Sequence, residues 1–476
     1  MRPIEFSSGR QDGAALLLMM LAVIIAMSTV LLAGINRNEL RVRQLTQTQQ
    51  ALAAARKALI DFAVLNADVN SLRSHSLPCP DIDASGGFLD GEAHETACGP
   101  AGVSVLGLLP WRTLGIAPLE DGSSTCLWYV VSGSYKEAGA ATSTMINVDN
   151  NGQLQLLDIE SGIVTEGVNP EDRPVAMVVA AMQPLPTQTR PGAGANSPCV
   201  YGANPAAYLD TDTGSGIANS ALSGIADALD VLGVVPGVDG GHNDRIVTIS
   251  RADIERHVLK RKDFDADMRS LGLAAAACIA DYGRNNPGGA ADKRLPWPAP
   301  VTMTDYRPNT AYDDANSGLR SGRLPDAVND SNAATGNAIA RVLSNCSPAA
   351  VPDWTPQQLA RWQNWKDHFF FAVAESFAPT AAVPSTCSSC MTVNGGGQFA
   401  AVLVFAGTRL TSAGQVRNAP PLDVDTKRYS SNYLESLNAA NVPGDSVAAN
   451  YVSGPASDTF NDLLFCIDDQ LLVTEC

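Results

Sequence analysis

An uncharged, strongly apolar run from Ala14 to Ile35 constrains this chain more than any other feature. It has the length of a bilayer-spanning helix, which needs about 20 apolar residues. It is too long for the apolar segment of an ordinary signal peptide, about 7–15 residues. Leu45, Leu52 and Leu59 then continue the apolar pattern at every seventh position, and no proline interrupts it. The pattern predicts one helix over residues 14–66, hydrophobic all round at first and amphipathic afterwards.

Charge and cysteine content indicate an exported globular protein. The net charge is −17, and the negative charge lies beyond the predicted helix. Such a surface repels phosphate backbones, so we expect no nucleic-acid partner. An even number of cysteines behind an export-type N-terminus predicts disulfides, paired mostly within each half of the body. The ten candidates are Cys79, Cys98, Cys126, Cys199, Cys278, Cys346, Cys387, Cys390, Cys466 and Cys476.

The body carries an internal duplication. Leu77–Pro80 is matched by Leu295–Pro298, and at the same interval Asn243–Ile246 is matched by Asn461–Leu464. Each half reads as a helix followed by loops and short strands, and the second helix begins near Ser250 with a capping-box spacing. The expected strands are Leu127–Ser132, Val175–Ala181 and Arg245–Ile249 in the first half, and Phe369–Val373, Ala401–Ala406 and Leu463–Ile467 in the second.

An acidic segment after the first repeat block has the spacing of a twelve-residue calcium loop. Asp81, Asp83 and Ser85 stand at positions one, three and five, Gly87 offers a carbonyl at position seven, and Glu92 stands at position twelve. Together these groups would supply six oxygens, as Ca²⁺ requires. The alternative interpretation is a solvated acidic loop closed by the flanking cysteines.

The other reactive residue types favour structural roles. Cys387 and Cys390 form a lone C-x-x-C pair without the further thiols or histidines that a zinc site needs, which favours a disulfide. Nucleophile-elbow, zinc-protease, phosphate-loop and dinucleotide motifs do not occur in the sequence. We therefore expect no catalytic residue and no cofactor other than calcium.

The N-terminus resembles that of type IV pilins and type II secretion pseudopilins. A short hydrophilic leader ends at Gly13, and the apolar half-helix starts at Ala14. The blocks Leu77–Asp81, Gly107–Gly115 and Leu127–Gly133 are also similar to prepilin-like proteins of Gram-negative bacteria. The resemblance implies that a prepilin peptidase cuts between Gly13 and Ala14.

Two positions depart from the family pattern. Ala14 stands where the family usually has Phe or Met, and Leu18 stands where it usually has Glu. The tip pseudopilin and some minor pilins lack that Glu as well. The departures therefore argue against a major, repeatedly stacked subunit.

The resemblance implies an α+β fold with a leader over 1–13, a membrane and spine helix over 14–66, and two tandem pilin-like lobes over 67–249 and 250–476. Each lobe would hold one helix and one small antiparallel sheet. The chain would be a minor, tip or initiating subunit of a type IV pilus or type II secretion pseudopilus that acts by assembly and not as an enzyme.

The partners that the resemblance implies are other pilin or pseudopilin subunits and the prepilin peptidase. The chain would cross the inner membrane once with its head in the periplasm, or reach the cell surface at a filament tip. Two alternatives remain: a membrane-anchored periplasmic or surface binding or adhesion protein outside any filament, and an anchored hydrolase, for which no catalytic motif was found.

Overall fold

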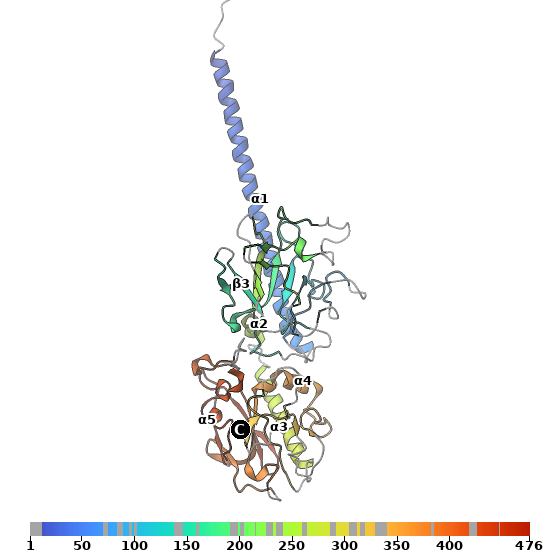
Figure 1. The fold of residues 1–476 in the computed structure, drawn as a ribbon, viewed down its shortest axis with the longest axis vertical. Helices are drawn as coiled ribbons and strands as arrows, with labels where there is room; N and C mark the ends of the chain where they lie inside the picture. Colours follow the sequence, from blue (N-terminus) through green and yellow to red (C-terminus); the bar gives the residue numbers. More distant parts are fainter. Residues whose placement is uncertain are drawn as a thin grey trace, which may run out of the picture.

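The molecule is elongated, with one long helix that projects from two lobes stacked end to end (Figure 1). The computed structural model describes residues 12–69, 75–82, 89–94, 98–99, 102–137, 146–158, 161–190, 199, 204–214, 216–224, 232–234, 241–258, 264–285, 292–303, 312–314, 319–328, 340–381, 385–417, 426–446 and 448–476.

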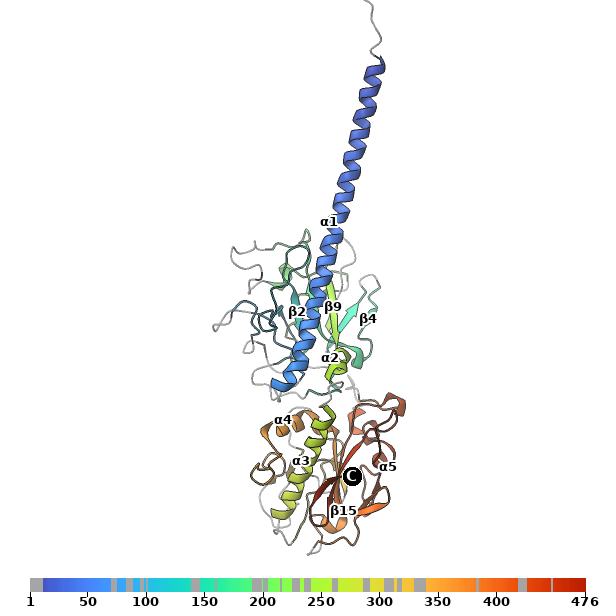
Figure 2. The ribbon, with the colours of Figure 1, turned by 180° about the vertical axis from the view of Figure 1, so that it is seen from behind.

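The helix α1 spans Asp12–Val69. Its C-terminal part lies against the first lobe, where Ala55, Leu59 and Ala63 are fully buried (Figure 2). These residues recur at four-residue intervals, so they share the face that packs on the sheet. The N-terminal part of α1 extends beyond the lobe. The same helix therefore anchors the first lobe and projects from it.

The predicted membrane anchor is wrong. Within the ranges given above, no helix has both the length and the apolar character that a bilayer crossing requires. This finding overturns the predicted single pass through the inner membrane and the location derived from it.

The first lobe is built on a four-stranded antiparallel sheet. Its order is β1 (Val105–Leu108), β2 (Trp128–Val131), β5 (Pro174–Ala180) and β9 (Arg245–Ser250). Two smaller sheets accompany it: β4 (Val164–Glu166), β3 (Leu154–Leu157) and β8 (Leu232–Val234), and the pair β6 (Thr211–Asp212) with β7 (Ile217–Ala218).

The second lobe is built on a seven-stranded sheet. Its strands are β10 (Ser321–Arg323), β13 (Phe369–Val373), β15 (Gly396–Phe405), β14 (Met391–Val393), β16 (Asn450–Tyr451), β17 (Leu463–Asp468) and β18 (Val473–Glu475). A separate pair joins β11 (Ala327–Val328) to β12 (Ala340–Arg341).

The remaining helices connect or cover these sheets. The α-helices are α2 (Arg251–Val258), α3 (Phe264–Asn285), α4 (Pro356–Trp365) and α5 (Ser436–Ala440). The 3₁₀-helices are η2 (Pro170–Asp172), η3 (Pro205–Ala207), η4 (Lys366–His368), η5 (Glu375–Phe377), η6 (Thr411–Ala413), η7 (Thr426–Arg428) and η8 (Ser430–Asn432).

The capping-box spacing at Ser250 is realised in the structure. The N–H of Ser250 donates to Oδ2 of Asp253 at 2.9 Å, and the N–H of Asp253 donates to Oγ of Ser250 at 3.2 Å. This reciprocal pair satisfies N–H groups that lack a partner at a helix start. It fixes the point where β9 ends and α2 begins.

The expected fold class is wrong. Instead of one small antiparallel sheet in each of two pilin-like lobes, the described residues form five sheets. Two strand pairs, β3 with β8 and β14 with β16, are parallel. The difference arises in the long connections. Segments whose sequence predicts loops form short strands there, and these strands pair into additional sheets.

Local contacts nevertheless recur between the two lobes. A Cβ atom at Gly107 would lie 2.6 Å from the carbonyl oxygen of Asp81, and one at Gly322 would lie 2.2 Å from that of Ala299. Both distances are too short for any side chain. In each lobe, a glycine in the first strand of the main sheet, β1 or β10, therefore lets that strand approach the segment that follows the repeated Leu-Pro-x-Pro block.

All ten cysteines are paired. The disulfides join Cys79 to Cys98, Cys126 to Cys199, Cys278 to Cys346, Cys387 to Cys390 and Cys466 to Cys476. Each bond stays within residues 67–249 or within 250–476. The cross-links therefore hold each lobe internally and leave the contact between lobes to non-covalent interactions.

Candidate functional site

The proposed calcium loop is described only at its ends, since Asp83, Ser85 and Gly87 lie outside the described residues. Oδ2 of Asp81 accepts the N–H of Gly91 at 2.7 Å, and Oε2 of Glu92 accepts the N–H of Leu89 at 2.9 Å. Burial, with smaller contributions from nearby acidic groups, raises the pKa of Asp81 to about 6. Both carboxylates thus accept hydrogen bonds from backbone N–H groups of the same loop. Calcium binding stays a prediction.

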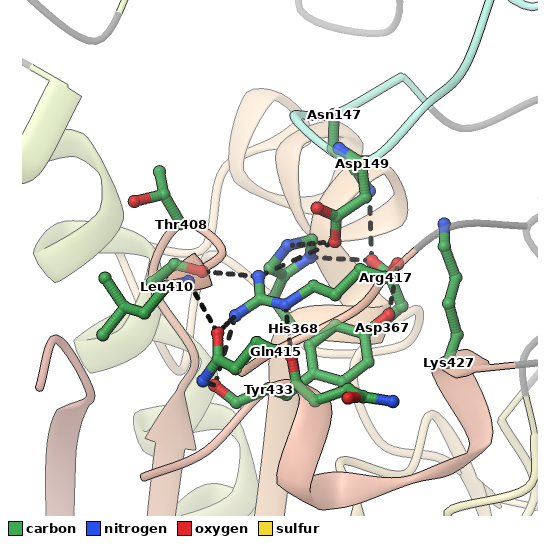
Figure 3. Close-up of polar contacts among 12 residues, drawn as sticks. Asn147, Asp149, Asp367, His368, Thr408, Leu410, Gln415, Arg417, Lys427 and Tyr433 are labelled. Carbon is green, nitrogen blue, oxygen red and sulfur yellow. Dashed lines mark hydrogen bonds and ion pairs between the residues drawn. The ribbon is translucent and has the colours of Figure 1, made fainter. Parts of the chain in front are cut away.

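A different charged cluster lies at the contact between the lobes (Figure 3). Asp149, from the connection before β3, points at His368 of η4, and its Oδ2 lies 3.0 Å from Nε2. On the other side of the ring, Nδ1 lies 2.9 Å from Oδ1 of Asp367. Nη1 of Arg417 lies 3.7 Å from the same Oδ2 of Asp149. We call Asp149, Asp367, His368 and Arg417 the junction cluster.

Amide contacts hold the junction cluster in place. Nδ2 of Asn147 donates to the carbonyl oxygen of Asn364 at 2.7 Å and to Oδ1 of Asp367 at 3.0 Å. The N–H of Ile146 donates to Oδ1 of Asn364 at 3.0 Å. Asn147 and Asp149 belong to the first lobe, and their partners belong to the second. The cluster is therefore a built contact between the two lobes.

The charges of the cluster set its protonation. Burial alone would raise the pKa of Asp149, but Arg417 and His368 outweigh burial and lower it well below the usual range. Burial alone would lower the pKa of His368, but Asp367 and Asp149 raise it. Burial lowers the pKa of the neighbouring Lys427 to about 8, although Asp149 opposes this change. Both shifts favour an imidazolium that lies between the carboxyl groups of Asp149 and Asp367.

Asp149, Asp367 and His368 also offer three ligand atoms within 4.8 Å of one another, as a metal site would. A metal dication there would lie close to Arg417 and Lys427, and it would need a deprotonated imidazole nitrogen. Oδ2 of Asp149 and Nε2 of His368 make an ion pair without an aligned hydrogen bond. The cations that surround Asp149 fit the ion-pair interpretation better than a metal.

A second arrangement of carboxyl groups occurs once in each lobe. Oδ2 of Asp244 accepts the N–H of Asp210 and Nδ2 of Asn219, both at 2.8 Å. In the second lobe, Oδ2 of Asp462 accepts the N–H of Glu435 at 3.1 Å and Nδ2 of Asn438 at 3.0 Å. We call Asp210–Asp244 and Glu435–Asp462 the carboxyl pairs.

An arginine and a glutamine flank each carboxyl pair in the same way. Nε2 of Gln188 donates to the carbonyl oxygen of Tyr208 at 3.0 Å, and Arg190 lies over the Tyr208 ring. Nε2 of Gln415 donates to the carbonyl oxygen of Tyr433 at 3.1 Å, and Arg417 lies over the Tyr433 ring. Arg417 is also a member of the junction cluster, so this residue takes part both in the surroundings of the carboxyl pair and in the contact between lobes.

The sequence reasoning missed both arrangements. The Asn-Asp dipeptides Asn243–Asp244 and Asn461–Asp462 were part of the matched blocks, so their repetition was a usable signal. Nothing in the sequence indicates that Asp149 meets His368, because their pairing depends on how the lobes dock. Both arrangements are buried, so neither offers an exposed functional surface.

Among the residues that the structure describes, the longest run of exposed apolar side chains lies on the projecting part of α1. Every described side chain from Leu16 to Ile25 is exposed, with values of 70% for Leu17 and 49% for Leu21. The proposed cleavage point between Gly13 and Ala14 lies in the first turn of the same helix. A large exposed apolar surface of this kind marks a contact with another molecule.

Comparison with known proteins gives no relative. No protein-family model, no curated protein and no solved structure matches this chain.

Proposed function

We propose that this protein is a minor subunit of a type IV pilus or type II secretion pseudopilus and acts by assembly. The observation that carries the proposal is the projecting part of α1, which exposes large apolar side chains at every position from Leu16 to Ile25 except Ala22. A helix that is apolar all round is stable in water only when other groups cover it. The proposed cover is the corresponding helix of neighbouring subunits.

The shape of the body favours a low-copy position. Two lobes stacked beyond α1 make a bulky head (Figure 1). Close repetition of such a head along a thin fibre would crowd neighbouring copies. Leu18, at the position where the family usually has Glu, agrees with a subunit at the tip or at the start of assembly. The prepilin peptidase and other pilin-type subunits are the partners that this proposal names.

The first test concerns self-association of the full chain. We expect sedimentation velocity to show assemblies of the wild-type protein in aqueous buffer, and monomers of the Leu17→Glu/Ile25→Glu variant, because two charges at exposed helix positions oppose helix packing. Gln49→Glu, an exposed position on the same helix, is the matched control and should assemble as the wild type does. A photo-crosslinker at Leu21 should map to α1 of a second copy.

Monomeric wild-type protein, or crosslinks that map to the body instead of α1, would contradict helix-driven assembly. Assembly through the body alone would favour the alternative of a binding or adhesion protein outside any filament.

The second test concerns processing in the native host. The proposal predicts that the mature chain begins at Ala14, because a prepilin peptidase would remove the leader after Gly13. N-terminal sequencing measures this directly, and Gly13→Leu should leave the leader attached. A mature chain that still begins at Met1 would contradict membership of the pilin class.

A further inference from the structure

A polar pocket opens in the second lobe at the end remote from the first lobe. Its volume is about 320 Å³, which falls in the range of small-ligand sites. β13 starts next to His368 at the junction and runs away from it, and Glu375 and Ser376 of η5 follow its far end. The pocket is therefore distant from α1 and stays accessible if α1 is covered.

The lining combines one indole with an ion pair and several hydroxyl groups. Nη2 of Arg320 lies 3.0 Å from Oε1 of Glu375, and Trp297 supplies an aromatic surface. The hydroxyl side chains that line the pocket are Ser376, Thr380, Thr386, Ser388 and Ser389.

Two polar atoms of the pocket have no hydrogen-bond partner. These are Nε of Arg320 and Oγ of Ser376, and both atoms are buried. Buried polar atoms are almost always hydrogen-bonded in folded proteins. A rotation of the Ser376 side chain would expose its Oγ to the pocket and let a polar ligand satisfy it.

One rim of the pocket is cross-linked. The disulfide between Cys387 and Cys390 encloses Ser388 and Ser389. The N–H of Ser388 also donates to the carbonyl oxygen of Thr386 at 2.8 Å. A constrained rim lowers the conformational entropy that binding would otherwise remove.

We propose that this pocket binds a neutral, hydroxyl-rich ligand, namely a saccharide unit. Glu375 and Arg320 neutralise each other, so the ion pair adds no net attraction for a charged ligand. Serine and threonine hydroxyls both donate and accept, which matches the hydroxyl groups of a sugar. Trp297 is 6% exposed and contributes an apolar edge against which C–H groups of a sugar ring can pack.

The test is saturation-transfer NMR on the full chain with a panel of neutral sugars: glucose, galactose, mannose, N-acetylglucosamine and lactose. We expect binding of at least one sugar at millimolar concentration. Ser376→Ala should weaken that binding about tenfold, because one hydrogen bond to the ligand is lost. The melting temperature should stay unchanged, because the hydroxyl has no partner in the free protein.

Ser123→Ala is the matched control, since Oγ of Ser123 is also buried without a partner but lies in the first lobe. It should leave sugar binding unchanged. Inorganic phosphate and choline test for an anion or a cation site. Three outcomes would overturn the proposal: no transfer from any neutral sugar, sugar binding that Ser376→Ala leaves intact, or binding of phosphate or choline alone.

Discussion

Asp149→Asn is expected to lower the free energy of unfolding by about 3–5 kcal/mol at neutral pH. The side chain keeps its shape but loses the charge that faces His368 and Arg417. Both cations are buried, with 0% and 1% of their side chains exposed, so solvent replaces little of the lost interaction. Breaking a buried ion pair by removing one partner leaves an uncompensated charge, which is the costly case.

Urea unfolding followed by tryptophan fluorescence measures this effect. The chain has six tryptophans, and the ring centroid of Trp365 lies 4.9 Å from that of His368, so the Trp365 part of the emission reports on the junction. Asp353→Asn, an exposed position in the second lobe, should change the stability by no more than about 0.5 kcal/mol. Equal stabilities of Asp149→Asn and wild type would show that the junction cluster contributes no net stabilisation.

Asp244→Asn is expected to stabilise the protein at pH 8 and to have little effect at pH 4. Burial, followed by the charge of Asp210, raises the pKa of Asp244 from 3.8 to about 7. Between pH 3.8 and about pH 7, Asp244 therefore keeps its proton in the folded protein and loses it in the unfolded chain. The free energy of unfolding falls as the pH rises from about 4 to about 7, because ionisation is costly only in the fold.

The pKa shift of Asp244 sets the size of the stabilisation expected at pH 8. One pKa unit corresponds to about 1.4 kcal/mol, so ionised Asp244 costs the fold on the order of 4 kcal/mol. Asparagine resembles the protonated acid, so the variant should lose this part of the pH dependence. The same sign holds for Asp462, where burial and Glu435 raise the pKa well above the usual range.

Urea unfolding at pH 4, 6 and 8 checks the prediction, again with Asp353→Asn as the control. The carboxyl of Asp244 also accepts two hydrogen bonds, from Asp210 and Asn219, and one amide oxygen can accept both. Equal destabilisation by Asp244→Asn at all three pH values would contradict the raised pKa and assign Asp244 to hydrogen bonding alone.

The sequence determined the features that depend on local pattern. Seven-residue spacing placed Leu52 and Leu59 on the packed face of α1, because two helical turns return a side chain to the same side. The apolar strand runs appeared close to their predicted positions: Phe369–Val373 forms β13 with those bounds, and Arg245–Ile249 lies within β9. Such segments are recognisable because periodicity and side-chain shape act within a few residues.

Tertiary structure decided what depends on segments far apart in the chain. The parallel pairing of β3 with β8, and of β14 with β16, arises from connections that read as plain loops, since hydrogen bonds between distant strands leave no local pattern. The junction cluster needs Asp149 and His368 to meet across the two lobes. Charged residues look like ordinary surface residues until docking removes their water, so only the fold could show that these charges are buried and paired.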